Sequence, residues 1–233
     1  MDETAGIFLG KGGGEHQFLN LALANRHGLI AGATGTGKTV TVQNLAESFS
    51  RVGVPVFVAD VKGDLSGVAM PGTESFKHHD KLIERAEEIG LDDYSYADSP
   101  TIFWDLYGKK GHPIRTTISE MGPLLLGRLM DLTDAQQGVL EIAFRYADDE
   151  GMLLLDLEDL QAMMVATSEN AKHLSARYGN VSRQSVGAIQ RKLLQLDNQG
   201  AAEFFGEPAL DIDDFFRSDE HGRGFVNILM SER

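Results

Sequence analysis

The stretch Gly32-Ala33-Thr34-Gly35-Thr36-Gly37-Lys38-Thr39 decides the fold class, because it matches the pattern G-x-x-x-x-G-K-[ST] at every fixed position. Its glycines allow the backbone to close around a phosphate, so that successive N–H groups point inward as an anion-binding nest. A helix that begins near Lys38 adds the partial positive charge of its N-terminus. The pattern therefore predicts a phosphate-binding loop over residues 32–39.

The side chains of this loop have distinct expected roles. Lys38 would reach the β- and γ-phosphate oxygens of a nucleotide, and it is the one residue that we expect to act in catalysis. Thr39 would bind Mg²⁺ through its hydroxyl group. The expected ligands are ATP and Mg²⁺, and the expected nucleotide-binding residues are Gly32, Ala33, Thr34, Gly35, Thr36, Gly37, Lys38, Thr39 and Val40.

The residues on either side of the loop predict a β-α-β unit. Residues 27–31 read as a short buried strand, residues 38–52 as a helix with a broad apolar side, and residues 54–59 as a parallel strand covered on both faces. A strand, a turn, a helix and a second strand within about thirty residues are typical of the α/β class.

Beyond this unit the sequence becomes mostly helical. Residues 75–90 predict a helix and residues 95–104 a further strand, but from about residue 116 to residue 216 strand character nearly vanishes. Thr133 and Gln136 form a capping box at the start of one of these helices. Strand character returns at residues 224–230. The predicted domains are a nucleotide-binding core over residues 1–105, a helical insertion over 106–220 and a return strand of the core over 221–233.

Composition excludes several classes of protein. Of the 233 residues, 42% are hydrophobic and 24% are charged, which is ordinary for a globular chain. Cysteine is absent, so neither a disulfide framework nor a cysteine-based zinc site can form. The formal net charge of −14 excludes a uniformly basic coat for nucleic acid, although a local basic face is compatible with it.

The sequence also bears on location. No apolar run approaches the roughly 18–20 residues that span a bilayer. The acidic residues 1–4 contain no signal-peptide core. We therefore expect a cytoplasmic protein without a membrane partner.

The acidic residue that completes such a nucleotide site is harder to identify. Asp60 ends the second predicted strand, and Asp60-Val61-Lys62-Gly63 fits the D-x-x-G pattern of GTPases, but no N-K-x-D motif follows it. Ligands of open α/β sheets gather at the carboxyl ends of the strands. Asp60, Lys62 and Asp64 are therefore expected near the nucleotide, without an assigned role.

Two other segments are candidates for the same acidic position. Asp156 follows four apolar residues and is followed by Leu157 and Glu158, but it lies in the helical stretch and is well placed to cap a helix over residues 157–165, which is the interpretation that we favour. The last apolar segment, residues 225–230, contains no aspartate.

The phosphate-binding loop and two further segments together resemble a known family. Residues 26–39 resemble the HerA/FtsK superfamily of ring-forming P-loop motors, in which the pattern H-x-x-(I/V)-x-G-x-T-G-(S/T)-G-K-(S/T) is typical. Residues 60–67 (DVKGDLSG) and 185–191 (SVGAIQR) are similar to the HerA-like bacterial ATPases, which are predicted helicases. The resemblance implies a RecA-like P-loop NTPase core with a parallel sheet and a mostly helical insertion. It also implies ATP hydrolysis and a hexameric homo-oligomeric ring that acts on DNA.

One departure from the family leads to further expectations. Family members continue beyond the position that matches Arg233, and their Asp-Glu acidic motif lies in that continuation. We therefore expect this chain to be an N-terminal part, truncated before the acidic motif, that hydrolyses ATP weakly or not at all by itself. We also expect residues 225–230 to be an incomplete strand with an exposed apolar face.

A local reversal of charge suggests where DNA could bind. Residues 171–196 contain no acidic residue, and Arg183, Arg191 and Lys192 lie on one predicted helix. The alternative is a solvated helix face, or a face that pairs with acids of a neighbouring subunit. An arginine finger could come from Arg177 or Arg183.

The function predicted from all these features is the ATP-binding module of a HerA-like DNA translocase or helicase, which couples ATP hydrolysis to movement on DNA. Two alternatives remain open at this stage. One is a nucleotide-binding regulatory ATPase that does not act on DNA, which the acidic balance of the chain favours. The other is a P-loop phosphotransferase that acts on a small molecule.

Overall fold

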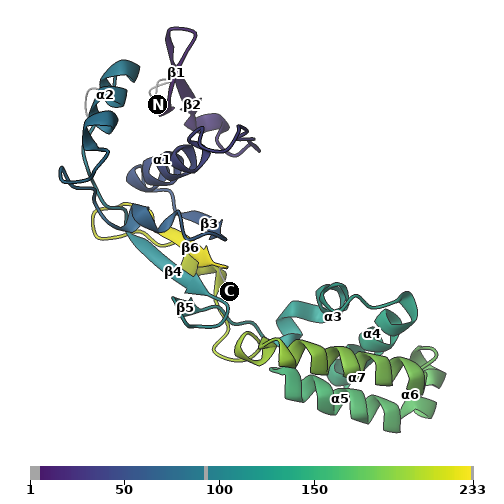
Figure 1. The fold of residues 1–233 in the computed structure, drawn as a ribbon. Helices are drawn as coiled ribbons and strands as arrows, with labels where there is room; N and C mark the ends of the chain where they lie inside the picture. Colours follow the sequence, from purple (N-terminus) through teal and green to yellow (C-terminus); the bar gives the residue numbers. More distant parts are fainter. Residues whose placement is uncertain (1–5, 92–93, 232–233) are drawn as a thin grey trace. The chain divides into compact units, whose positions relative to one another are not determined.

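The computed structural model describes residues 6–91 and 94–231, which form two compact units. The first unit comprises the chain up to Trp104 together with the chain from Asp211, and the second comprises Asp105–Leu210. Each unit has its own cluster of buried apolar side chains. The predicted α/β class is confirmed, with strands in the first unit and a helical second unit (Figure 1).

The first unit contains most of the strands. Its elements in chain order are β1 (Gly6–Gly12), β2 (Glu15–Asn20), the 3-10 helix η1 (Leu21–Leu23), α1 (Lys38–Arg51), β3 (Val56–Asp60), the 3-10 helix η2 (Ser66–Ala69), α2 (His79–Ile89), β4 (Thr101–Asp105), the 3-10 helix η4 (Ile212–Phe215) and β6 (Val226–Met230). β1 and β2 form an antiparallel hairpin. The predicted helix over residues 38–52 and the predicted strands that became β3 and β4 are confirmed.

The main sheet has the order β3-β6-β4-β5, in which β5 is the short strand His112–Pro113. β3 and β6 run parallel, with Val56 opposite Val226 and Asp60 opposite Met230. β6 has a hydrogen-bonded strand on each side, and Figure 1 shows it in yellow between β3 and β4. The return strand is therefore an internal strand of the core.

Burial along these strands corrects two expectations. Val226 and Ile228 are both 0% exposed, so the prediction of an incomplete strand with an exposed apolar face is wrong for β6. β3, by contrast, is an edge strand and is not covered on both faces, because Phe57 is 48% exposed. The strand order places β6 inside the sheet and β3 at its margin, where less of the molecule packs over the strand.

The strand expected immediately before the phosphate loop is also absent. Within the described chain, residues 27–31 join neither sheet, and Leu29 is 90% exposed. A strand exists only through hydrogen bonds to a neighbour. The described residues offer this segment no such neighbour, so its apolar character alone does not make it a buried strand.

The buried side chain of Asn227 links three parts of the first unit. Its Oδ1 accepts a hydrogen bond from Trp104 Nε1 (3.0 Å), and its Nδ2 donates to the carbonyl oxygens of Val56 (3.2 Å) and Phe215 (3.1 Å). Asn227 is 0% exposed, and the Trp104 ring packs edge-on against Phe215. These bonds connect β6, β3, β4 and η4 inside an otherwise small apolar core.

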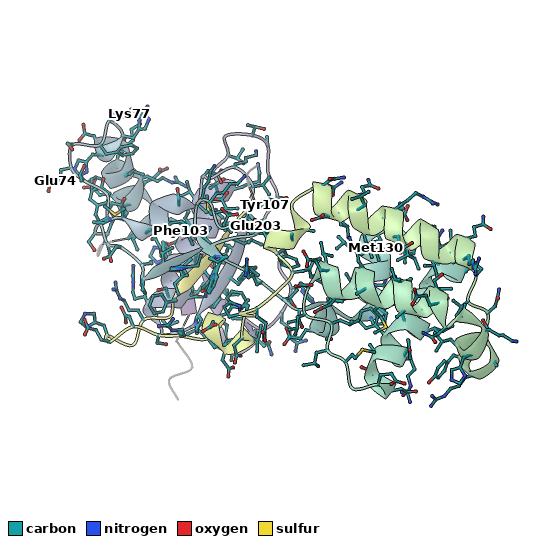
Figure 2. The ribbon with its side chains drawn as sticks, turned by 90° about the horizontal axis from the view of Figure 1, so that it is seen from below. Glu74, Lys77, Phe103, Tyr107, Met130 and Glu203 are labelled. Atoms are coloured by element: carbon teal, nitrogen blue, oxygen red, sulfur yellow. The ribbon has the colours of Figure 1, made fainter. Side chains whose placement is uncertain are left out.

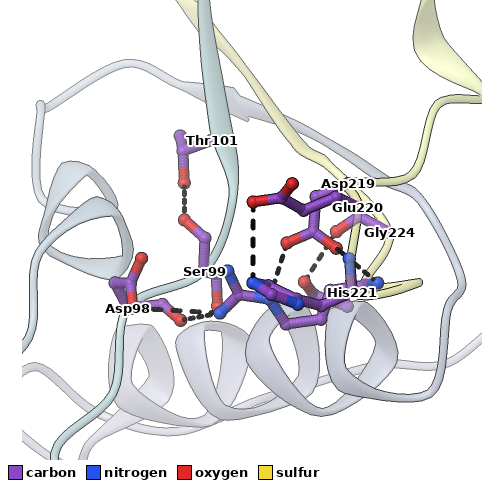
Figure 3. A network of polar contacts seen from close by, with 9 residues as sticks. Asp98, Ser99, Thr101, Asp219, Glu220, His221 and Gly224 are labelled. Atoms are coloured by element: carbon purple, nitrogen blue, oxygen red, sulfur yellow. Dashed lines mark hydrogen bonds and ion pairs between the residues drawn. The ribbon is translucent and has the colours of Figure 1, made fainter.

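A polar network closes the loop that leads into β6 (Figure 3). The Asp219 carboxylate accepts hydrogen bonds from the backbone N–H groups of His221 (2.9 Å) and Arg223 (2.8 Å) and from Arg223 Nε (2.8 Å). Arg223 Nη1 also donates to the carbonyl oxygen of Asp98 (3.0 Å). Burial raises the pKa of Asp219, but the three hydrogen bonds outweigh it and hold the pKa below its ordinary value.

Gly224 joins this loop to the end of α1. Ser50 Oγ donates to the Gly224 carbonyl (2.6 Å), and Gly224 N–H donates to the Ser50 carbonyl (2.8 Å). A Cβ atom at position 224 would overlap the backbone of Val54 and Pro55. Only glycine therefore permits this close approach of the two chain segments.

The second unit is a bundle of helices. Its elements are β5, α3 (Ile118–Leu129), α4 (Asp134–Asp149), α5 (Leu157–Glu169), α6 (Ala171–Tyr178), α7 (Arg183–Asn198) and the 3-10 helix η3 (Ala201–Glu203). α3 packs on α4, and α7 packs on both α4 and α5. Leu140, Leu160, Ile189 and Leu193 are each 0% exposed at the centre. Met130 belongs to the same cluster and is labelled in Figure 2.

The helix caps of this unit are local interactions that the sequence predicts. Thr133 N–H donates to Gln136 Oε1 (3.1 Å), which confirms the capping box of α4. Asp156 Oδ1 accepts from Asp159 N–H (2.9 Å) at the start of α5, which confirms the capping interpretation of Asp156. Across residues 6–91 and 94–231, none of the helices has the length and apolar character needed to cross a membrane.

Replacing Asn227 by alanine should destabilise the first unit. The change removes the acceptor for Trp104 Nε1 and the donor to two carbonyl oxygens, and a lost buried hydrogen-bond partner costs about 1–3 kcal/mol. We expect the free energy of unfolding to fall by about 2–4 kcal/mol.

Urea unfolding followed by the fluorescence of Trp104, the single tryptophan of the chain, measures this change directly. Asn198→Ala, at the exposed end of α7, serves as the control and should shift the free energy by less than about 0.5 kcal/mol. Coincident curves for Asn227→Ala and the parent chain would contradict the role assigned to Asn227.

Candidate functional site

The predicted phosphate loop lies between the extended segment that follows η1 and the first turn of α1. Gly35 and Gly37 have φ values of 81° and 90°, in the region that favours glycine. A Cβ atom at Gly32 would lie 2.5 Å from Thr36 Oγ1, so a side chain at position 32 would displace the Thr36 hydroxyl group from its present position. The three glycines of the motif thus each meet a local backbone or packing requirement of the loop.

The Lys38 side chain folds back over the loop that precedes it. Its ammonium group donates to the carbonyl oxygens of Gly32 (2.8 Å) and Ala33 (2.7 Å). Thr36 also donates to the Ala33 carbonyl through its hydroxyl group (2.8 Å). These bonds place the positive charge of Lys38 inside the loop. They also occupy the carbonyl oxygens of Gly32 and Ala33, which would otherwise repel an anion.

Several N–H groups of the same loop, unlike these carbonyl oxygens, have no hydrogen-bond partner among the described residues. In the part of the chain that the structure describes, no hydrogen bond uses the N–H groups of Gly35, Gly37, Lys38 or Thr39. Some of these are the donors that the first turn of a helix leaves without internal partners. Together with the charge of Lys38, they form a set of donors suited to phosphate oxygens.

A second loop, residues 61–65 after β3, is held by the side chain of Asp60. The carboxylate accepts hydrogen bonds from the N–H groups of Lys62 (3.1 Å) and Gly63 (2.8 Å) through Oδ1 and from Leu65 (2.9 Å) through Oδ2. Asp60 is 2% exposed. The role left open for Asp60 is therefore filled by a structural task, because its oxygens are engaged in shaping this loop.

The Asp60 loop brings Asp64 to the phosphate loop. Thr39 Oγ1 donates to Asp64 Oδ2 (3.2 Å), and Gln43 Nε2 donates to the Asp64 carbonyl oxygen (2.9 Å). The sequence predicted Asp64 near the nucleotide only from its place at the carboxyl edge of the sheet. Its contact with Thr39 has no signature in the sequence, since it depends on how the Asp60 loop turns.

The Thr39 hydroxyl oxygen and the Asp64 carboxylate are suited to a hard cation that phosphate groups also bind. Among the described residues, no group of three or more His, Asp or Glu side chains could hold a metal ion by itself. Mg²⁺ prefers oxygen ligands and is usually bound by one or two protein groups together with phosphates and water. The Thr39 hydroxyl and Asp64 carboxylate match that requirement in chemistry and in number.

The other acidic candidates lie elsewhere. Asp156 belongs to the helical unit, where its carboxylate caps α5, and Glu158 lies in the first turn of the same helix. Neither therefore belongs to the unit that carries the phosphate loop.

The basic residues proposed for DNA lie on α7. Arg183 and Arg191 are exposed and Lys192 is half-buried. No ion pair within residues 6–91 and 94–231 involves any of the three. Arg177, by contrast, pairs with Asp149 (3.0 Å) and stacks over the Tyr178 ring. The Tyr178 hydroxyl donates to Asp149 and lowers its pKa, and burial only partly opposes this effect.

A cavity in the first unit lies apart from the loop residues. Its volume is about 420 Å³, and it is lined by residues of β1, β2, α1 and the segment after α2, among them Phe8, His16, Glu47 and Tyr94. Burial raises the pKa of Glu47, and the Arg51 guanidinium only partly offsets that effect. No residue of 32–40 lines this cavity.

Comparison with known proteins gives one result. The family described as helicase HerA-like C-terminal matches residues 9–233.

The chain belongs to this HerA-like family. The match covers both units, from β1 to beyond β6. It agrees with the RecA-like α/β core and with the resemblance carried by residues 26–39, 60–67 and 185–191. No curated protein and no solved structure matches the chain.

Proposed function

We propose that this HerA-like chain is the ATP-binding module of a DNA translocase or helicase, in which ATP hydrolysis drives movement on DNA. The observation that carries the nucleotide part is the phosphate loop. Lys38 provides a positive charge there, and four N–H groups have no acceptor in the described chain. Residues 32–40 would hold the phosphates, and Thr39 would contribute its hydroxyl group to Mg²⁺. A bound Mg²⁺ ion would neutralise the charge of the β- and γ-phosphates.

Binding of phosphate exchanges one set of partners of Lys38 for another. In the described structure its ammonium group contacts only the neutral carbonyl oxygens of Gly32 and Ala33. Charge-assisted hydrogen bonds to phosphate are about twice as strong as bonds between neutral groups. The ammonium group therefore favours the bound phosphate over the loop carbonyls, and removal of Lys38 affects ligand binding more than folding.

Lys38→Ala should weaken the binding of Mg·ATP by about 10- to 100-fold, since hydrogen bonds to charged groups contribute about 1.5–3 kcal/mol. Titration calorimetry with ATP and excess Mg²⁺ measures the affinity, and the thermal midpoint shows whether the variant remains folded. Lys81→Ala, on the exposed face of α2, is the matched control and should bind as the parent does. Equal affinity of Lys38→Ala and the parent would sink the proposal.

The DNA part of the proposal is supported by α7. Arg183 and Arg191 are eight positions apart and exposed, and they have no acidic partner among the described residues. The nearby acid Glu203 lies by Arg115 (4.0 Å) instead. In a chain of net charge −14, two cations without carboxylate partners favour contact with an external anion. A homo-oligomeric ring would repeat this patch around a channel.

The double variant Arg183→Ala/Arg191→Ala should reduce affinity for duplex DNA without changing affinity for Mg·ATP. Loss of two phosphate contacts should also lower the slope of log affinity against log salt by about 2. Fluorescence anisotropy with labelled duplex DNA at several salt concentrations measures both quantities. Arg128→Ala, exposed on α3 of the same unit, is the control. An unchanged slope in the double variant would exclude α7 as the DNA contact.

A further inference from the structure

The carboxylate of Asp64 has a position that the folding of its own loop does not require. The loop is already fixed by three hydrogen bonds to the Asp60 carboxylate. The backbone of Asp64 is separately tied to α1 by Gln43 (2.9 Å). The carboxylate itself contacts Thr39, and that contact is the one hydrogen bond it makes in the described chain.

The charge of Asp64 is not compensated by a neighbouring side chain. None of the ion pairs in the described residues includes Asp64, and its partner Thr39 is a neutral hydroxyl. The phosphate loop beside it is built for an anion. A carboxylate next to bound phosphates would repel them, unless a cation lies between the two.

The spacing of the two oxygen atoms fits such a cation. Mg²⁺ binds its ligands octahedrally at about 2.0–2.1 Å, so that adjacent ligand oxygens lie about 3 Å apart. Thr39 Oγ1 and Asp64 Oδ2 are 3.2 Å apart. The two groups can therefore serve as neighbouring ligands after a small adjustment of either side chain.

We propose that Asp64 supplies a carboxylate ligand to the Mg²⁺ ion that accompanies the nucleotide at Thr39. This inference rests on the proposed function, because it requires a nucleotide in the phosphate loop. It assigns to Asp64 a role distinct from that of Asp60, which shapes the loop. It also makes the second loop a direct partner of the bound metal ion.

Asp64→Asn tests the proposal with little change in shape. The amide oxygen of asparagine can still accept the hydrogen bond from Thr39, but the negative charge is lost. ATP affinity is measured by calorimetry twice, once with EDTA and once with excess Mg²⁺. Glu84→Gln, exposed on α2, removes one charge at a distant position of the same unit and is the control.

We expect the charge of Asp64 to matter for the gain in ATP affinity that Mg²⁺ produces. In EDTA, Asp64→Asn should bind ATP at least as tightly as the parent, since a repulsive charge is gone. The gain in affinity on adding Mg²⁺ should be about tenfold or more smaller in Asp64→Asn than in the parent and in Glu84→Gln.

The other outcomes overturn specific claims. An equal Mg²⁺ gain in Asp64→Asn and the parent overturns the assignment of Asp64 and leaves the proposed function intact. A loss of affinity of equal size with and without Mg²⁺ also overturns it, because Asp64 would then only position the loop. Failure of the parent chain to bind ATP in either condition overturns the proposed function itself.

A second measurement keeps the test independent of the variant's folding. With ATP and Mn²⁺ in place of Mg²⁺, and with aspartate labelled with ¹³C at the carboxylate, electron–nuclear double resonance of the parent chain should show the strong carbon coupling of a carboxylate bound directly to the metal. Absence of this carbon coupling in the parent chain with bound ATP and Mn²⁺ would overturn the assignment.

Discussion

The buried carboxylate of Asp60 is the constraint on which the arrangement of the site depends. It ends β3, whose parallel register with β6 places it opposite Met230, and it gathers the N–H groups of the loop that follows. That loop carries Asp64 to Thr39 at the start of α1. The Asp60 side chain therefore joins the end of the sheet to the second loop, and the second loop reaches the phosphate loop through Asp64. The contacts of Asp64 with Thr39 and Gln43 join this loop to the start of α1, and they depend on the loop shape that Asp60 sets.

The internal position of β6 is the second determinant of this unit. Its burial rests on the Asn227 hydrogen bonds and on the close approach at Gly224, since the apolar core itself is small. The sheet thus combines strands that are far apart in the sequence, and residues that follow the helical unit lie beside the end of β3 at Asp60. Ser231 illustrates this, because its N–H group and its hydroxyl both donate to the Asp60 carbonyl oxygen (3.0 Å each).

Sequence reasoning succeeded where the interaction is local. The caps at Thr133 and Asp156 and the helix that begins at Lys38 depend on residues a few positions apart, and the structure contains each of them. It failed for residues 27–31, for the cover of β3 and for the burial of β6, because each depends on which strand lies beside which. It also left Asp64 without a role, because the contact with Thr39 spans 25 positions and no spacing rule describes it.

The proposed function depends most on one interaction, in which the N–H groups of the loop at residues 32–39 receive the phosphates of a nucleotide. Amide hydrogen exchange of the intact chain, measured with and without millimolar Mg·ATP, tests it directly. We expect slower exchange at the N–H groups of Gly35, Gly37, Lys38 and Thr39, which have no acceptor in the described chain, and a smaller effect over residues 61–65. Exchange that is unchanged over residues 32–40 at saturating Mg·ATP would contradict it.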